Sequence, residues 1–342
     1  MRQSVLCLLT VSWALGCSLT VRNPQACLFD GPPVCAAGTS CDPMLNQCVP
    51  TTDGGPSPTD LQCSGYFCSD SPASLASGTL LEVWGTSPSD IWAILYPNVI
   101  VHWDGQSWMQ SKPGGGSALH GISGLSAQNI WAVGDGGTVY RWDGVTWAQQ
   151  SAPSAANLYG VWVESAGQVW VAGFVGQIYQ GDGTTWKPSL NDSNYGNFLS
   201  LSGVDAQNIW AVSNQGKIAT WNGAAWSMTS VSAGSLFSVS ARAANNVWTV
   251  GVSSLAFYFD GTGWTQKQAA TVSTPGLNSV WTVDADTAWA VGDGGAIFKW
   301  YRGAWSLQPS PTASDLNSVW SGPGQQTWIV GNNGTVLHQE AP

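Results

Sequence analysis

Residues 129–147, "NIWAVGDGGTVYRWDGVTW", decide the fold because this stretch is repeated along the chain. A catalytic constellation normally occurs once, whereas a structural unit recurs. Near copies begin at Asp90, Gln168, Asn208, Asn246, Thr287 and, truncated, at Gln326. The central tryptophans of the seven copies are 39, 39, 40, 38, 41 and 39 residues apart: Trp92, Trp131, Trp170, Trp210, Trp248, Trp289 and Trp328. A period near 40 residues predicts stacked supersecondary units.

Each unit carries four short apolar runs. "IWAVG" and "TVYRW" alternate large and small side chains around β-branched residues, which predicts strands. A further apolar run precedes each copy, such as "LHGISG" from Leu119, and a tryptophan follows it. Asp-Gly or Asn-Gly, as in Asp143 and Gly144, comes directly after the "TVYRW" run. This dipeptide predicts a type I′ hairpin turn, in which both central residues have positive φ.

Four antiparallel strands in each of seven units predict an all-β fold, a seven-bladed β-propeller of four-stranded antiparallel blades. Both faces of each blade are then buried, and large flat side chains fill the space between blades. A tryptophan buries on the order of 200 Å², which stabilises by at most ~5 kcal/mol. The recurring tryptophans are therefore interpreted as walls between blades.

The seventh unit ends at "TVLHQEAP" and lacks an outer strand, which would leave an exposed sheet edge. In the other units the outer tryptophan lies 10 to 13 residues before the next inner strand. The same spacing before Leu80 places the missing strand at residues 64–70, with Phe67 in the tryptophan position and Cys63 or Cys68 as a tether. The propeller is thus expected to span residues 62–342.

The first residues, "MRQSVLCLLTVSWALGCS", have one basic residue and an apolar run too short to span a bilayer. This pattern predicts an export signal over residues 1–16. "ALGC" resembles the bacterial lipoprotein box, which implies lipidation of Cys17. With serine rather than aspartate at position 18, the resemblance implies the outer membrane of a Gram-negative cell. The alternative is cleavage after Gly16 without a lipid, which would give a secreted protein.

All eight cysteines precede residue 69. Cys7 belongs to the signal and Cys17 is assigned to the lipid, which leaves six thiols for three disulfides with 15 possible pairings: Cys27, Cys35, Cys41, Cys48, Cys63 and Cys68. A zinc site is disfavoured because the nearest histidine is His102. Residues 17–50 are expected to form a cysteine-rich segment, and residues 51–61 a polar linker.

The net charge is −10, and the ten Lys and Arg residues form no cluster. Such a chain cannot neutralise a run of phosphates, and anionic lipid would repel it. We therefore expect no nucleic-acid partner, and membrane contact only through an N-terminal lipid anchor. We also expect a monomer without a cofactor or a metal.

The units "SLSGVDAQNIWAVSNQGKIATWNGAAW" and "ISGLSAQNIWAVGDGGTVYRWDGVTW" resemble the tectonin repeat, a propeller repeat associated with lectins. The matching residues belong to turns and to the walls between blades. The resemblance therefore implies the fold directly, and it implies a carbohydrate ligand only through the association with lectins.

Variation between the units gathers on one rim, which carries the loops between second and third strands and the connections between blades. Loops on a rigid scaffold often carry binding residues. The candidate ligand-binding residues on this rim are Tyr96, Asp135, Phe174, Tyr195, Asp293 and Asn332. The aromatic rings could stack on sugars, and the polar groups could bond to hydroxyls. Alternatively, they are ordinary surface aromatics and turn residues. One carboxylate in each "GDGG" loop is too few for calcium.

Catalytic signals are weak. The three histidines, His102, His120 and His338, show no spacing typical of a triad or a metal site. The propeller arginines fall in separate blades, which disfavours a sialidase-like site. We therefore expect a non-enzymatic cell-surface protein that binds glycans. The alternatives are a protein-docking scaffold in the cell envelope and, less favoured, a glycoside hydrolase using two rim carboxylates.

Overall fold

The computed structural model describes residues 39–42, 47–50, 62–64, 67–69, 71–72, 75, 78–112, 116–267, 275–322 and 326–339. The expected signal, Cys17, Cys27, Cys35 and the linker lie outside these residues. Strands β1 (Thr39–Asp42) and β2 (Gln47–Pro50) form an antiparallel pair in which Cys41 is opposite Cys48. Within the described residues, no helix has the length and apolar character needed to cross a membrane.

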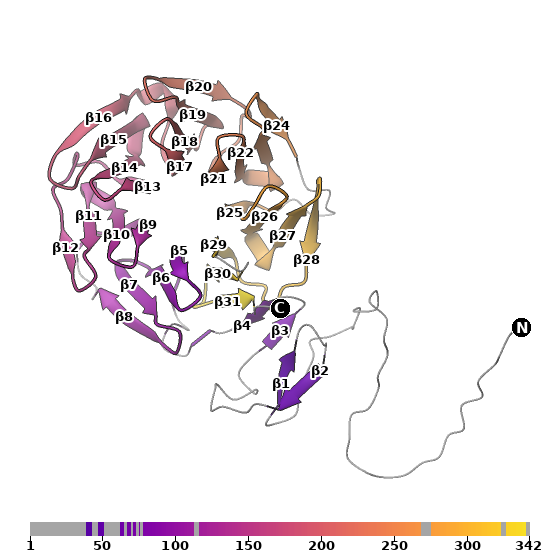
Figure 1. The fold of residues 1–342 in the computed structure, drawn as a ribbon. Helices are drawn as coiled ribbons and strands as arrows, with labels where there is room; N and C mark the ends of the chain where they lie inside the picture. Colours follow the sequence, from indigo (N-terminus) through magenta and orange to yellow (C-terminus); the bar gives the residue numbers. More distant parts are fainter. Residues whose placement is uncertain are drawn as a thin grey trace, which may run out of the picture. The chain divides into compact units, whose positions relative to one another are not determined.

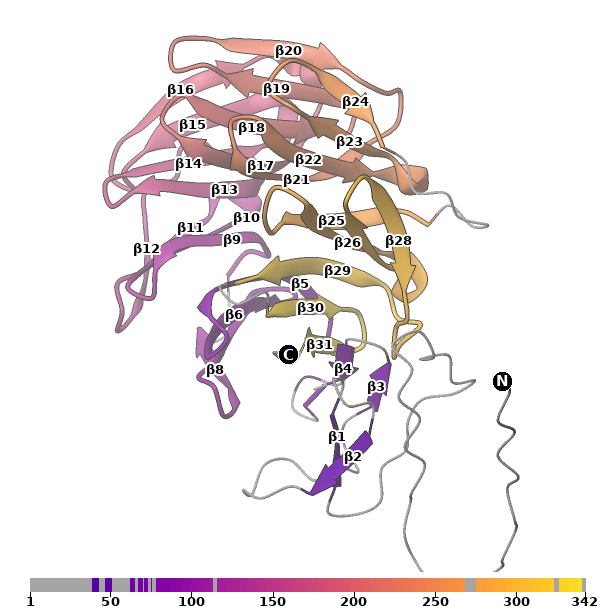
Figure 2. The ribbon, with the colours of Figure 1, turned by 45° about the vertical axis from the view of Figure 1, so that its right-hand side comes forward.

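Seven antiparallel sheets are arranged in a ring (Figure 1), which confirms the predicted seven-bladed propeller. The inner strands surround a central channel. The first strand of each blade lies nearest the centre, as Figure 2 also shows. These inner strands are β5 (Leu80–Ser87), β9 (Leu119–Ser126), β13 (Leu158–Ser165), β17 (Phe198–Asp205), β21 (Leu236–Ala243), β25 (Leu277–Thr282) and β29 (Leu316–Ser321).

The second strands carry the central tryptophan of each repeat. They are β6 (Asp90–Leu95), β10 (Asn129–Gly134), β14 (Gln168–Gly173), β18 (Asn208–Ser213), β22 (Asn246–Gly251), β26 (Thr287–Gly292) and β30 (Thr327–Gly331). The third strands follow after a short loop. They are β7 (Val99–Trp103), β11 (Val139–Trp142), β15 (Gln177–Gly181), β19 (Lys217–Trp221), β23 (Ala256–Phe259), β27 (Ile297–Tyr301) and β31 (Val336–Gln339).

The outer strands of the first six blades are β8 (Trp108–Lys112), β12 (Trp147–Gln149), β16 (Trp186–Asn191), β20 (Trp226–Ser230), β24 (Trp264–Gln266) and β28 (Ala304–Gln308). Short 3-10 turns lie in the loops and connections: η1 (Asp135–Gly137), η2 (Phe174–Gly176), η3 (Ser193–Tyr195), η4 (Val252–Ser254) and η5 (Asp293–Gly295).

A strand from the beginning of the chain completes the seventh blade. β4 (Phe67–Ser69) pairs antiparallel with β31, and β3 (Gln62–Ser64) extends the sheet to five strands. This is the position at which the repeat spacing placed a strand. Phe67 is fully buried, and its ring centroid lies 5.2 Å from that of Trp289 in an edge-on contact. Cys68 is disulfide-bonded, and the Cα register places Cys63 opposite it.

The tryptophans pack between blades. Each second-strand tryptophan is at most 4% exposed. In four blades it contacts a pair of tryptophans, one on the third strand and one on the outer strand of the following blade. The central rings and their partners are Trp92 with Trp142 and Trp147, Trp170 with Trp221 and Trp226, Trp248 with Trp300 and Trp305, and Trp328 with Trp103 and Trp108. Phe67 makes the equivalent contact with Trp289, which explains how it substitutes for a tryptophan.

Three inner-strand tryptophans lie over glycines of the adjacent blade. Trp84 packs over Gly124 of the next blade, where an added Cβ would lie 2.5 Å from the Trp84 ring and 2.9 Å from the Asn129 carbonyl oxygen. Trp162 lies over Gly203 in the same way, and Trp320 approaches Gly85. In these three pairs the glycine leaves the space that the bulky ring of the adjacent inner strand occupies.

The turns between third and outer strands differ from the expected type I′ geometry. In four-residue loops such as Asp104–Ser107 only the glycine has positive φ, 94° at Gly105. The Asp104 side chain instead accepts the N–H groups of Gln106 and Ser107, both at 2.8 Å, so it satisfies the turn itself. Only the copy without Asp or Asn, Arg302 and Gly303, has positive φ at both positions, 48° and 98°.

Candidate functional site

A β-bulge re-aims one side chain at the start of every inner strand. The register between first and second strands shifts after the first residue of each inner strand, so the second residue lies out of the ladder. Bulges commonly redirect a side chain. The seven residues, here called the bulge ring, are Leu81, His120, Tyr159, Leu199, Phe237, Asn278 and Asn317.

A second set of equivalent residues follows the second strands. In every blade the N–H of this residue donates to the carbonyl just before the inner strand, as in Asp135 N to Ala118 O at 2.9 Å. The seven residues, here called the loop ring, are Tyr96, Asp135, Phe174, Asn214, Val252, Asp293 and Asn332. Five of the six candidate ligand-binding residues therefore occupy one structural position.

Three of the four polar members of the loop ring hold members of the bulge ring. Asp135 Oδ1 lies 2.8 Å from His120 Nε2. Asp293 Oδ1 accepts a hydrogen bond from Asn278 Nδ2 at 3.2 Å. The remaining polar pair is Asn332 Oδ1 with Asn317 Nδ2 at 3.0 Å. Asp135, Asp293 and Asn332 thus position side chains of the bulge ring. The end of the channel beside these two rings is here called the channel mouth.

The three aromatic candidates differ in how far their rings are exposed to solvent. Tyr96 and Phe174 are 55% and 45% exposed. Tyr195, at the end of η3 in a connection between blades, is partly buried against the core, and Lys217 Nζ lies 5.4 Å from its ring centroid. Two exposed rings therefore remain available on this rim for contact with a ligand.

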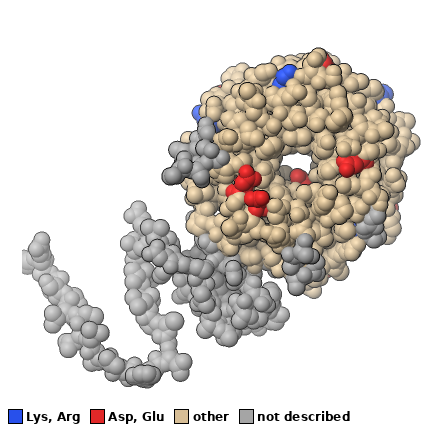
Figure 3. Space-filling view, turned by 180° about the vertical axis from the view of Figure 1, so that it is seen from behind, with Lys and Arg blue, Asp and Glu red and all other residues tan. Residues whose placement is uncertain are grey.

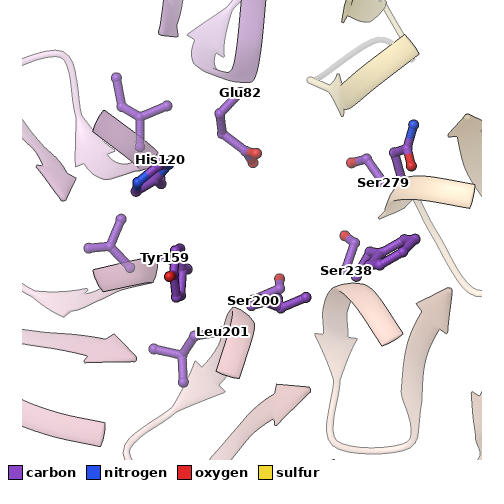
Figure 4. A pocket seen from close by; sticks show the side chains of 14 residues that line it. Glu82, His120, Tyr159, Ser200, Leu201, Ser238 and Ser279 are labelled. Carbon is purple, nitrogen blue, oxygen red and sulfur yellow. The ribbon is translucent and has the colours of Figure 1, made fainter. Parts of the chain in front are cut away.

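Five members of the bulge ring line a narrow pocket of about 90 Å³ at the channel mouth. Tyr159 and Phe237 are partly exposed members of its lining, whereas Ile122, Val161 and Leu201 border it but pack into the cores between blades. Glu82 extends into it, and Figure 4 shows its carboxylate and the hydroxyl groups of three serines facing the same space. The serines are Ser200, Ser238 and Ser279.

The serines also join successive blades. Each hydroxyl oxygen accepts the N–H of the next inner strand at 3.2 Å: Ser200 from Val239, Ser238 from Val280, Ser279 from Val319 and Ser318 from Val83. A hydroxyl oxygen has two lone pairs, and each N–H occupies only one of them. The serines consequently keep acceptor capacity toward the channel.

Glu82 is the carboxylate of this pocket. It is partly accessible from the channel, but its carboxyl group is surrounded by protein atoms. Burial raises the pKa of Glu82 to about 8, although a hydrogen bond with Ser318 acts in the opposite direction. Without a nearby positive charge, the group therefore favours its neutral form at pH 7.

The channel widens below Glu82 into a cavity of about 760 Å³, bordered by inner strands from all seven blades. Its lining includes Arg242 and Asp284 as well as Trp84, Trp162 and Trp281. On the face drawn in Figure 3, carboxylates lie beside the central opening, while most of the surrounding surface is uncharged. The opening is therefore electronegative on that side.

The other histidines have structural contacts. The His102 ring stacks on Trp92 with centroids 4.0 Å apart, and both side chains bond to Asp90. His338 stacks on Trp328 at 5.2 Å, and burial lowers its pKa. In the part of the chain that the structure describes, no group of three or more His, Cys, Asp or Glu residues could hold a metal ion.

Sequence reasoning missed Glu82 and the bulge ring. An alignment of the units by their inner strands contains the signal for Glu82, because this position holds Gly or Ser in the other six: Gly121, Gly160, Ser200, Ser238, Ser279 and Ser318. The orientation of the bulge ring had no comparable signal, since a bulge breaks the alternation from which side-chain direction is inferred.

The sequence matches no known protein-family profile and no curated protein. Many solved structures share the fold. A catalytically inactive virginiamycin B lyase from Staphylococcus aureus with quinupristin has a TM-score of 0.71 at 11% identity, covering 80% of this chain and 98% of that one. The WD40 repeats of RRP9 give 0.70 at 10% identity, with 82% and 100% covered. YCF48 bound to D1 peptide gives 0.64 at 16% identity, with 78% and 93% covered.

At these identities the likeness establishes the fold alone. The solved propellers include a lyase and a peptide-bound protein, so they place different activities on one architecture. A function for this chain must therefore be inferred from its own residues, above all those at the channel mouth.

Proposed function

We propose that this protein is a non-enzymatic docking protein that binds a segment of a protein partner across the bulge ring and loop ring. The observation that carries this proposal is the narrow mouth pocket, in which residues of the loop ring hold two of the lining side chains by hydrogen bonds. Hydrogen bonds from the loop ring fix His120 and Asn278 before any partner arrives. Such preorganisation reduces the entropy lost on binding.

The size of the pocket favours a side chain over a whole small molecule. Its volume of about 90 Å³ is below the roughly 300–1,000 Å³ typical of ligand pockets. Apolar residues and tethered polar groups share the lining, which suits the tip of one inserted side chain while the rest of a peptide lies on the rim. The peptide bound to YCF48 supports this use of the fold.

Glycan binding is the second candidate. Tyr96 and Phe174 expose 55% and 45% of their surface on the same rim, and exposed aromatic rings can stack on sugars. The resemblance to the tectonin repeat favours the same ligand class. In this function the sugar would lie on the rim beside the channel, because the mouth pocket is too small for a hexose ring.

We also propose that the protein acts outside the cytoplasm. The apolar N-terminal run supports export, and the six remaining cysteines support an oxidising compartment. The box around Cys17 supports a lipid anchor in the outer membrane. Radiolabelled palmitate should then appear in the parent and be absent from a Cys17→Ser variant.

Selection of peptides from a random library on the purified protein tests the docking proposal. Selected peptides should bind the parent and a Tyr301→Ala variant equally, because Tyr301 is 48% accessible and lies at the end of β27 away from the rim loop, where it pairs with Thr287. They should bind at least tenfold more weakly to Phe237→Ala. Peptide binding that is the same in all three proteins would contradict docking at the channel mouth.

A glycan array with the same proteins tests the second candidate. A sugar signal that is lost in a Tyr96→Ala, Phe174→Ala double variant and kept in Tyr301→Ala would support the lectin function. An array without signal, for protein shown to be folded, would exclude the glycans displayed.

A further inference from the structure

Glu82 is a carboxylate at a position where the architecture does not require one. The equivalent residue is glycine in the second and third blades and serine in the last four. The serines bond to the N–H of the next blade, so this position normally serves blade packing. A charged group at one of seven equivalent positions therefore points to a role outside the packing of the ring.

The pocket contains no lysine or arginine side chain to pair with this carboxylate. Its lining residues include neither Lys nor Arg, and neither ion pair found among the described residues involves Glu82. A carboxylate taken out of water without a cation is unfavourable. The chain carries a net charge of −10, and carboxylates lie beside the opening in Figure 3. The site is therefore suited to attract a cation from a partner.

The lining matches an ammonium group on an aliphatic stem. The Glu82 carboxylate and the three serine oxygens supply acceptors on several sides of one space (Figure 4). An ammonium has three donors that can reach them. The rings of Tyr159 and Phe237, which are partly exposed and line the same pocket, can pack against a (CH₂)₄ stem while its charged end is solvated by the protein.

We propose that the channel mouth binds a lysine side chain of the protein partner, with Glu82 as its counter-ion and Ser200, Ser238 and Ser279 as further acceptors. This inference rests on the proposed docking function and names the chemistry that the partner must present. The peptide backbone would remain on the bulge ring and the loop ring.

Binding should be coupled to proton release. The pKa of Glu82 is about 8 in the free protein, and a neighbouring ammonium lowers it. The other titratable groups facing the mouth pocket are His120, which bonds to Asp135, and Tyr159. Arg242 and Asp284 line the cavity below. Lysine binding near pH 7 therefore releases up to one proton, and affinity increases as pH rises toward 8.

Isothermal titration calorimetry with Nα-acetyl-lysine methylamide tests the site directly. The parent should bind this probe and should bind the norleucine and Nε-acetyl-lysine analogues at least tenfold more weakly. Titrations at about pH 7 in two buffers of different ionisation enthalpy should show proton release. Glu82→Gln should weaken binding at least tenfold and abolish the release.

Glu164→Gln is the matched control. This carboxylate is also on an inner strand, but it accepts a hydrogen bond from Trp170 Nε1 at 2.7 Å, and a glutamine oxygen can still accept it. The variant should bind the probe as the parent does. Equal binding of the neutral analogues, or unchanged binding by Glu82→Gln, would overturn the lysine site. An arginine probe that binds as tightly as lysine would overturn its specificity.

The two proposals can fail separately. If selected peptides lose binding to Phe237→Ala but bind Glu82→Gln as tightly as the parent, docking at the rim stands and the lysine site is wrong. If the lysine probe binds through Glu82 while no selected peptide depends on Phe237, the cation site stands and peptide docking at this rim is wrong.

Discussion

Asp135 Oδ1 lies 2.8 Å from His120 Nε2, so a loop after the second strand fixes a side chain of the first strand in the same blade. The two residues are 15 positions apart in sequence and come together because the β-bulge turns His120 out of its ladder. The loop ring thus controls the shape of the channel mouth through the bulge ring.

Asp135→Ala should release His120 without unfolding the protein. Both side chains are partly exposed, so the free energy of unfolding should fall by about 1 kcal/mol or less. Nitrogen NMR of the His120 ring should show a changed balance of tautomers, because the group bonded to Nε2 is gone. Asp135→Asn keeps an acceptor oxygen and should resemble the parent. An unchanged ring spectrum in Asp135→Ala would argue against this positioning role.

Phe67→Ala should weaken the closure of the ring. The ring of Phe67 is fully buried and packs edge-on against Trp289, and loss of a buried phenylalanine costs about 3–5 kcal/mol. Urea unfolding should show a decrease of this size. Phe174→Ala, which removes a phenylalanine that is 45% exposed, should change stability far less. Equal effects of the two substitutions would contradict the closing role of β4.

Gly124→Ala should destabilise the contact between the first two blades. The new methyl group would meet the Trp84 ring at 2.5 Å and a backbone oxygen at 2.9 Å, and such overpacking typically costs about 1–3 kcal/mol. Gly167→Ala is the matched control, since nothing lies within 4 Å of its added Cβ. Thermal unfolding of the two variants should separate them, and a Gly124→Ala protein as stable as the parent would show that the Trp84 ring does not require glycine at this position.

Glu82 should make stability depend on pH. Its pKa rises from 4.5 to about 8 on folding, so between these values the folded protein holds a proton that the unfolded chain has released. The free energy of unfolding therefore falls as pH rises through this window, by up to about 1.4 kcal/mol per unit, and the dependence ends above the folded pKa. Glu82→Gln should lack this contribution.

Urea unfolding of parent and variant from about pH 4 to about pH 9 tests this dependence. Glu82→Gln should gain stability relative to the parent as pH rises, and Glu164→Gln should not. Parallel pH profiles for the parent and Glu82→Gln would show that the carboxyl group keeps its ordinary pKa.

The architecture could be predicted because the chain repeats itself. Seven copies gave seven blades, and the missing outer strand had a defined spacing from Leu80, which led to Phe67. The turn geometry was predicted wrongly, because an aspartate such as Asp104 accepts the N–H groups of the turn and removes the need for positive φ at its own position.

The candidate site could be predicted only in part. Comparison of the units led to five members of the loop ring, since variation on a rigid scaffold marks surface loops. It did not predict that Asp135, Asp293 and Asn332 hold other side chains. Their partners belong to the bulge ring, and the direction of those side chains depends on bulges that the sequence pattern does not show. Glu82 lies inside a strand, and its importance depends on the channel that six other strands enclose.

The closing strand has a consequence for the order of folding. β4 is made before any of the seven inner strands, and its partner β31 follows all of the inner strands in the sequence. During synthesis Phe67 must remain without its final contacts until the sixth and seventh blades have emerged. Pairings between distant parts of a chain form slowly, so the ring should close in a late step. Exposed blade edges would persist until then, which makes incomplete chains prone to aggregation.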